Sequence, residues 1–408
     1  MLALLTLGAV FILIAIRRIG AFSLQIWQIM LLGAITVLIT GQISPADALS
    51  AINFEIIAFL FCVFTIGQAM EESGYLSQFA AALFGRAKSV DQLILAILLG
   101  FGLLSTLLMN DTMAIIGTPV VLLLARKHGL AAKPLLLTLA FAITIGSVMS
   151  PIGNPQNLLI AVTLSDPFIT FFRYLAVPTF INLFVAYLVL KYAFRTELAG
   201  RPLLIRSPDA VKDQKLARLA QVSLALMLIL IAVKIALGFA HLPIDLRLTD
   251  IALIAAVPVL LSEKRVKLIR EIDWYTLIFF VALFIVMQSV WDSGIFQSLL
   301  AHLQLDITAP PVIMTISVLL ARLISNVPLV GLYLPLLIHA GATPAGLLAL
   351  AAGSTIAGNL LILGAASNII IIQHAERSGE TLSFVEFAKV GIPLASVNIL
   401  VYALLLLL

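Results

Sequence analysis

The chain has 408 residues, of which 62% are apolar and only 11% are charged. Soluble domains are nearer half apolar and a quarter charged, so this composition predicts an all-α polytopic membrane protein. At about 20 apolar residues per crossing, the length suffices for roughly ten to twelve spans and leaves no stretch for a soluble domain. No phosphate-binding GxxxxGK[ST] pattern occurs, which excludes a pump with its own ATPase. The single cysteine, Cys62, excludes disulfides and Cys-based zinc sites.

The net charge of +4 does not indicate nucleic-acid binding, because the basic residues punctuate apolar segments. Lys and Arg concentrate in the cytoplasmic loops of membrane proteins. With both termini outside, 20 of the 24 Lys and Arg residues fall on the cytoplasmic side. The distribution therefore predicts an integral protein of the cell (inner) membrane with its N-terminus and C-terminus outside.

Apolar runs predict about ten transmembrane helices, at 2–16, 24–40, 54–70, 133–164, 177–194, 221–240, 249–262, 274–290, 343–375 and 390–408. Two further apolar regions, 92–125 and 312–340, are interrupted in the middle by the polar stretches Asn110–Thr112 and Ser325–Pro328. Their arms of about 13 to 17 residues are short for a crossing. We interpret these regions as two re-entrant helical hairpins; two pairs of short full spans are the alternative.

The two halves of the chain resemble each other in sequence. Residues 52–74 align with 272–294 at an offset of 220, and three later blocks align in the same order. The matched pairs in these later blocks are Asn110/Asn326, Pro119/Pro335, Gly153/Gly364, Asn157/Asn368, Phe172/Phe387 and Pro178/Pro393. The two copies begin on opposite sides of the membrane by the span count, which predicts an inverted repeat, the architecture of many secondary transporters.

This repeat defines the predicted organisation of the chain. It consists of an extra N-terminal helix at 1–23, a first repeat at 24–194 (hairpin 92–125, unwound helix 133–164), a basic linker at 195–220, a connecting helix at 221–248, and a second repeat at 249–408 (hairpin 312–340, unwound helix 343–375).

Four polar breaks interrupt the apolar segments, at the two hairpin tips and within 146–157 and 358–368. Broken helices persist in a membrane only where protein or a wet cavity satisfies their backbone. Freed carbonyls can bind a cation, and half-helix N-termini suit an anion. We therefore expect substrate contacts at Asn110, Thr112, Asn157, Ser325, Asn326 and Asn368, and cation contacts at Asn110, Gly153, Asn154, Asn326, Gly364 and Ala365. The alternative is that each break is a packing kink.

Three ionisable residues lie at depth in the apolar segments. Asp111 can carry a proton or bind a cation, or it can cap the half-helix that begins at Thr112. Arg322 can contact an anion or neutralise Asp111, or it can anchor its hairpin. We expect Lys234 to reach the outer end of its span. The five histidines are scattered, so the sequence predicts no metal site beyond a sodium site.

These motifs resemble the ion transporter superfamily, which includes arsenite permeases, divalent anion/sodium symporters, citrate permeases and some sodium/proton antiporters. The resemblance rests on Asn followed nine residues later by Pro at both hairpin tips, on the two unwound Gly to Asn spans, and on the IDW…SG segment at 272–294. It implies a scaffold and a mobile transport domain that work by an elevator mechanism, often in a homodimer. It also places a sodium-binding Ser at Ser105. The Asn-Asp pair at 110–111 is more similar to the arsenite permeases than to the carboxylate branch.

The sequence thus predicts a secondary active transporter and no enzyme. The leading hypothesis is transport of a small anion or oxyanion, arsenite-like first and carboxylate-like second, coupled to a proton or sodium gradient. The alternative is a sodium/proton antiporter on the same scaffold, with Asp111 binding the cation and Arg322 setting its affinity for protons. Expected partners are membrane lipid and a small ion, without a cofactor beyond the coupling ion and without nucleic acid.

Overall fold

The computed structural model describes residues 2–16, 18–19, 22–161, 163–195, 203, 210–239, 246–294, 298, 308–321 and 326–407. Within these residues the first half contains α1 (Leu2–Ile16), α2 (Ile26–Ile39), α3 (Pro45–Ala51), α4 (Phe54–Glu72), α5 (Tyr75–Phe84), α6 (Val90–Leu108), α7 (Asn110–His128), α8 (Ala132–Ser147), α9 (Pro155–Ala161) and α10 (Pro167–Ala193). One antiparallel pair, β1 (Arg18–Ile19) with β2 (Phe22–Ser23), separates α1 from α2.

The second half contains α12 (Gln214–Phe239), α13 (Leu248–Leu260), α14 (Arg265–Glu271), α15 (Trp274–Asp292), α17 (Pro310–Leu320), α18 (Asn326–His339), α19 (Pro344–Ile356), the 3₁₀ turns η1 (Ala357–Asn359) and η2 (Ile362–Gly364), α20 (Ala366–Arg377) and α21 (Phe384–Leu405). Six helices, α4, α6, α10, α12, α15 and α21, are long and apolar enough to cross a membrane. Several shorter apolar helices accompany them, and the prediction of a helical polytopic membrane protein is confirmed.

The arms of the first hairpin are longer than the 13 to 17 residues expected. Helices α6 and α7 have 19 residues each, which at 1.5 Å per residue is about 28 Å. Helix α6 continues through Ser105 and Thr106 because their hydroxyls donate to the carbonyls of Gly102 and Leu103 and therefore do not disturb the helix. The chain breaks only at Met109, which has a φ of 64°.

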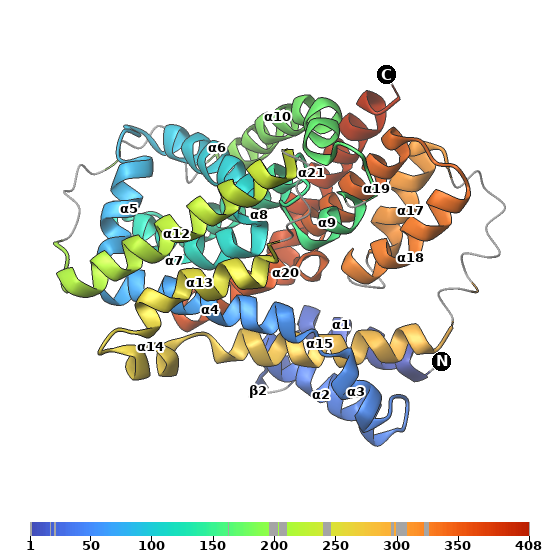
Figure 1. Ribbon diagram of the computed structural model, residues 1–408, viewed down its shortest axis with the longest axis horizontal. Coiled ribbons are helices and arrows are strands. Elements are labelled where there is room, and N and C mark those ends of the chain that lie inside the picture. Colours follow the sequence, from blue (N-terminus) through green and yellow to red (C-terminus); the bar gives the residue numbers. More distant parts are fainter. Residues whose placement is uncertain are drawn as a thin grey trace.

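Helices of the two halves pack on each other reciprocally. Helix α2 packs on α15 and α13 on α4, while α7 packs on α20 and α18 on α9. Within each half, α6 packs on α8 and α17 on α19. Figure 1 shows α2, α3, α4, α13, α14 and α15 in the lower part of the view and the hairpins with α8 to α10 and α19 to α21 above them. The exchange of partners is the pattern that an internal repeat predicts.

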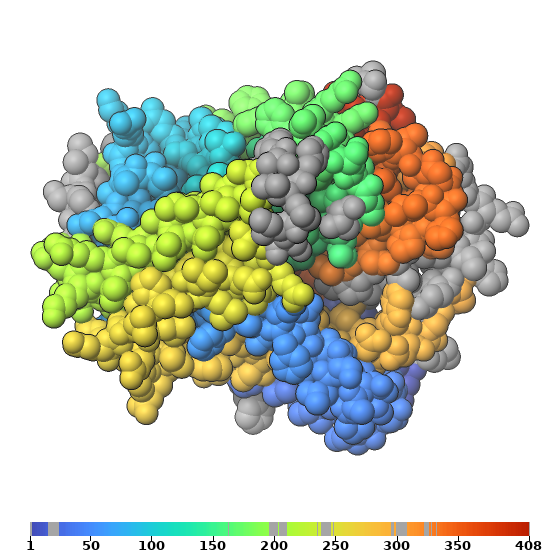
Figure 2. Space-filling model, viewed as in Figure 1, coloured from blue at the N-terminus to red at the C-terminus, as the bar shows by residue number. Residues whose placement is uncertain are grey.

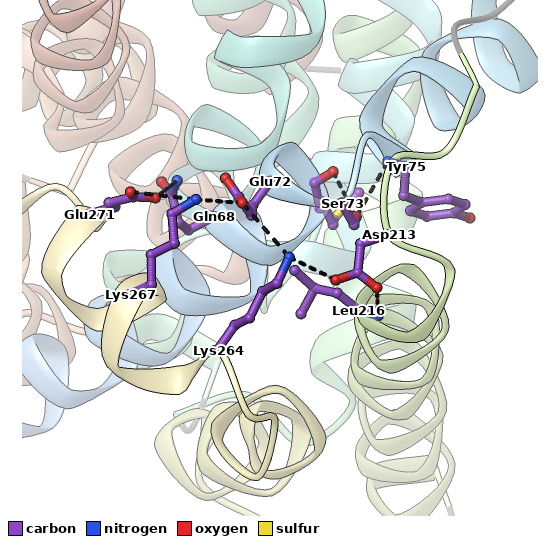
Figure 3. Close-up of polar contacts among 10 residues, drawn as sticks. Gln68, Glu72, Ser73, Tyr75, Asp213, Leu216, Lys264, Lys267 and Glu271 are labelled. Atoms are coloured by element: carbon purple, nitrogen blue, oxygen red, sulfur yellow. Dashed lines mark hydrogen bonds and ion pairs between the residues drawn. The ribbon is translucent and has the colours of Figure 1, made fainter.

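Ion pairs join the end of α4 and the start of α14 to Asp213, the residue just before α12 (Figure 3). They lie on the side of the molecule to which the sequence assigns most Lys and Arg residues, here called the basic face. The Lys264 ammonium lies 2.8 Å from an Asp213 carboxylate oxygen and 4.0 Å from Glu72. Lys267 lies 2.5 Å from the same Glu72 oxygen. The backbone N–H of Lys212 donates to the carbonyl of Ser73. Helices α12 and α13 then run side by side over α4 and form one surface on the face shown in Figure 2.

Lys234 lies near the end of α12, where its ammonium donates to the carbonyl of Leu246, 2.6 Å away. This carbonyl lies just before α13. The contact agrees with the expectation that the Lys234 side chain extends to the end of its helix rather than into a binding site.

Candidate substrate cavity

A cavity of about 460 Å³ lies between the two hairpin tips, the start of α20 and the middle of α15. It brings together five residues that the sequence assigned to the site, namely Asn110, Asp111, Asn326, Gly364 and Ala365. These residues come from α7, α18 and the η2 to α20 junction, which are far apart in sequence. The hairpin tips and the second break therefore share one cavity.

The tip of the first hairpin is held against the first helix break. The backbone N–H of Asn110 donates to the carbonyl of Gly153 over 2.9 Å. A φ of 64° at Met109, which is not a glycine, permits the sharp reversal between α6 and α7. Such backbone strain is concentrated at functional sites. The Asn110 side-chain oxygen is buried and has no hydrogen-bond partner among the described residues.

Asp111 is only 9% exposed and lines the cavity. Its carboxyl group has no hydrogen bond or ion pair with another described residue. The alternative that Asp111 caps the half-helix is wrong: α7 begins at Asn110, two residues before Thr112, and Met109 occupies the N-cap position without a side-chain cap. The Asp111 carboxyl group is thus available to a ligand, close to a helix N-terminus that favours negative charge.

The tip of the second hairpin makes the corresponding contact with the second break. The Asn326 side-chain amide donates to the carbonyl of Gly364 over 3.3 Å. The Asn326 oxygen, like that of Asn110, is buried without a partner in the described part of the chain. The two other residues assigned to this tip, Arg322 and Ser325, lie outside the described residues.

Other predicted site residues lie behind the cavity wall. The Asn157 amide donates to the carbonyls of Ser147, Val148 and Ser150, at 3.2, 3.3 and 2.9 Å. The Asn154 amide donates to the hydroxyl groups of Ser147 and Thr355, and its oxygen accepts the backbone N–H of Asn157. Both asparagines therefore hold the first break in shape and do not line the cavity.

Ser105, Thr112 and Asn368 are also buried but do not line the cavity. Ser105 donates to Gly102, and Asn368 donates to the carbonyl of Gly358 over 2.8 Å. The Thr112 hydroxyl and the Asn368 oxygen have no partner within the described ranges.

The opposite wall of the cavity was not predicted from the sequence. It consists mainly of α15 side chains and includes Phe279, Phe280, Phe284, Met287 and Trp291. The sequence singled out this helix because residues 272–294 align with residues 52–74. The apolar side chains of this segment gave no indication of a binding role. A polar residue, Gln156, was also missed although it lies between two assigned asparagines in the sequence.

Asp111 is the only ionisable residue among the described residues that line the cavity. The remaining polar side chains in the lining are the amides of Asn53, Asn110, Gln156, Gln288 and Asn326 and the indole of Trp291. Among the described residues there is also no cluster of three His, Cys, Asp or Glu that suits a transition metal. The cavity thus offers neutral hydrogen-bonding groups, one carboxyl group and an apolar wall.

On the basic side of the cavity, polar contacts join the end of α20 to the start of α15. The Thr276 hydroxyl bridges the carboxylate of Asp273 and the side-chain amide of Gln373. Arg377 donates to the carbonyl of Glu271 over 2.6 Å. The residues lining the cavity instead extend to Asn53, at the start of α4, and to the end of α15. The cavity is therefore extended toward the face opposite the basic one.

Comparison with known proteins gives one family and several relatives. Residues 10–346 match the citrate transporter family. The silicon efflux transporter LSI3 of rice, Oryza sativa subsp. japonica, is 26% identical, covering 89% of this chain and 88% of the relative. An uncharacterized transporter of Mycobacterium tuberculosis is 26% identical over 98% of this chain and 96% of its own. The putative transporter arsB of Dictyostelium discoideum is 21% identical over 91% and 85%, respectively.

Among solved structures, the YdaH transporter of Alcanivorax borkumensis is similar with a TM-score of 0.46 and 16% identity, covering 99% of this chain and 95% of that protein. The family match spans well over half of the chain and agrees with the resemblance to the ion transporter superfamily. The chain is a secondary transporter and belongs to the citrate transporter family.

Proposed function

We propose that this protein moves a small, weakly acidic oxyacid that is uncharged at neutral pH, of the arsenous or silicic acid class, in exchange for a proton or sodium ion. The observation that carries the proposal is the cavity lining, in which two hairpin-tip amides and one carboxyl group meet without a cation among the described residues. The relatives named for silicon efflux and arsB support this class of solute.

The hydroxyl groups of such a solute match the spare acceptors of the cavity. The side-chain oxygens of Asn110 and Asn326 are buried without donors, and an unsatisfied buried acceptor costs about 1–3 kcal/mol. Solute O–H groups satisfy both oxygens. A citrate trianion, by contrast, would be buried next to the Asp111 carboxylate, where like charges repel each other.

Asp111 is the proposed carrier of the coupling ion. Its carboxyl group lines the same cavity as the side-chain amide of Asn110, so a bound proton or sodium ion and a bound solute share one cavity of about 460 Å³. We infer that the carboxyl group must release its ion before the solute binds. The solute is therefore exchanged for the ion. The ion and the solute then cross in alternation as the two hairpins and α8 to α10 move against α2 to α4 and α13 to α15, in the elevator manner that the resemblance implies, within a homodimer.

Transport in proteoliposomes tests this proposal. The full-length protein is reconstituted and presented separately with arsenous acid, silicic acid, sulfate and citrate under an imposed pH or sodium gradient. The expected result is saturable, gradient-driven uptake of a neutral oxyacid, accompanied by proton or sodium movement in the opposite direction. Uptake of citrate alone would contradict the proposal.

The second candidate function is sodium/proton antiport without a further solute. The same orphaned oxygens favour it, because the Asn110 and Asn326 oxygens and the Asp111 carboxylate are hard ligands of the kind that bind sodium. In the same vesicles, sodium-driven proton movement at full rate in the absence of every oxyacid would select this second function.

A further inference from the structure

A second, larger cavity lies away from the substrate cavity, in a groove between the start of α8, the end of α10 and the start of α21. Its volume of about 990 Å³ is at the upper end of the range for small-molecule pockets, roughly 300–1,000 Å³. The transport mechanism gives it no role. We propose that this groove binds an anionic phospholipid, with the phosphate at Lys133 and Lys389 and the acyl chains along α10 and α21.

The polar groups gather at one end of the groove. Lys133 lies 2.6 Å from Glu386, and both side chains remain partly exposed at 45% and 40%. Lys389, one turn further along α21, is exposed and has no ion pair with another described residue. The lining thus carries two ammonium groups against one carboxylate, and the excess charge is positive.

Two neighbouring features strengthen attraction for a phosphate at the same end. The guanidinium of Arg195 lies over the ring of Tyr192, 5.4 Å from its centroid, and Tyr192 lines the groove. Helix α8 begins after Ala131, which provides no side-chain cap, so its first N–H groups and its positive dipole end face this region.

The rest of the groove is apolar and faces the surface of the helix bundle. Leu188, Val189, Leu137 and Pro393 line its far end. Leu188 is 48% exposed, and its neighbours on α10 and α21 include other exposed apolar side chains such as Ile392. The change from cations to apolar side chains along one groove matches an amphipathic lipid, whereas a free anion would use only the charged end.

The location on the basic face agrees with this choice of ligand. The positive-inside distribution places Lys133, Lys389 and Arg195 in the cytoplasmic leaflet, where anionic lipids concentrate, and each basic residue near that surface adds about 1 kcal/mol of attraction, or about fivefold in affinity. Tyr192, 74% exposed, is a typical residue of the headgroup region.

Native mass spectrometry and thermal unfolding of the detergent-purified full-length chain test the proposal. The probes are palmitoyl-oleoyl phosphatidylglycerol, phosphatidylcholine with the same chains, and glycerol phosphate. The expected result is that phosphatidylglycerol binds at least fivefold more tightly than phosphatidylcholine and alone raises the unfolding temperature. The variant Lys389→Gln should lose about fivefold of this preference.

Two further variants keep the test decisive. Lys133→Gln leaves the Glu386 carboxylate to offset Lys389, so the lining loses its excess positive charge and the preference for the anionic lipid should fall by about the same fivefold. Lys88→Gln removes an exposed charge on the same face, in the α5 to α6 loop, and should leave the preference unchanged. Equal binding of both lipids, an unchanged preference in Lys389→Gln, or protection by glycerol phosphate equal to that by the lipid would each overturn the proposal.

Discussion

The two helix breaks occupy corresponding positions in the repeat but satisfy their polar groups differently. At the first break, Asn157 donates to three carbonyls, and Asn154 is bonded through both its nitrogen and its oxygen. At the second break, the matched Asn368 donates to one carbonyl, Gly358. The side-chain oxygens of Asn368, Ser367 and Asn359 there have no partner among the described residues.

This difference indicates a structural role for one break and a binding role for the other, although the two occupy equivalent positions in the repeat. Buried polar groups are normally satisfied, and those that are not require an explanation. The first break is closed on itself and holds the first hairpin tip through the carbonyl of Gly153. The second break keeps spare oxygens next to the backbone that lines the cavity at Gly364 and Ala365. The first break is therefore a rigid support, and the second is the better place for a ligand.

The largest effect is expected from Gly153→Ala. A Cβ atom at this position would lie 2.1 Å from the carbonyl oxygen of Ser147, so the backbone of the first break must shift. We expect the free energy of unfolding to fall by about 3 kcal/mol or more. Transport should be lost with it. In Gly358→Ala, at the second break, the Cβ atom would lie 2.8 Å from the Ala365 methyl group, with Thr144 and the Gly364 carbonyl at 3.4 and 3.5 Å, so a smaller loss is expected. Thermal unfolding of both variants measures the difference, and equal losses would contradict a rigid first break.

A smaller difference is expected between Asn157→Ala and Asn368→Ala. The first substitution removes the donor for three buried carbonyls and should cost about 2 kcal/mol, whereas the second removes one donor and should cost about 1 kcal/mol. The two variants serve as matched controls for each other because both delete a buried asparagine amide. Unfolding temperatures measured in the same detergent give the ranking, and the reverse ranking would show that the second break is the more rigid one.

The smallest effect is expected on the basic face, which is remote from both breaks. The pKa of Asp213 lies below its usual value because its carboxylate accepts the Leu216 N–H and pairs with Lys264. A depressed folded-state pKa stabilises the protein fully above the unfolded value of about 3.9, and this contribution is lost as the pH falls from there through the lower folded-state pKa.

Asp213→Asn should therefore lower the unfolding temperature slightly at pH 7 and not at all at the most acidic pH that the folded protein tolerates. Melting curves recorded from pH 7 downward follow the gap between variant and parent. A gap that widens toward acid pH would refute the assignment.

The sequence predicted the positions of the breaks because Gly, Pro and Asn interrupt otherwise apolar runs at 109–112, 146–157 and 358–368. It could not assign roles to individual asparagines: Asn110 faces the cavity and Asn157 faces carbonyls, although both are amides at breaks. The arms of the first hairpin were underestimated because α6 begins at Val90 and α7 includes Asn110–Thr112 and Arg126–His128, polar residues that lie outside the apolar runs.

The apolar half of the site was beyond sequence reasoning for a related reason. In the sequence, Phe279, Phe280 and Phe284 cannot be distinguished from core residues by residue type or spacing. Only their position opposite the hairpin tips makes them a cavity wall. The short helices α3, α5 and α14 were also missed, since seven to ten residues carry too little periodicity to be separated from the adjoining loops.

The most direct test of the account is ion flux coupled to solute flux for Asp111→Asn in proteoliposomes. Asparagine has nearly the same shape but carries no proton or charge that can be exchanged. In Asp111→Asn, solute exchange down its own gradient should persist, while solute movement driven by a pH or sodium gradient should fall at least tenfold. Gradient-driven transport that is unchanged in Asp111→Asn would contradict the coupling role of Asp111, because the coupling ion would then be carried elsewhere.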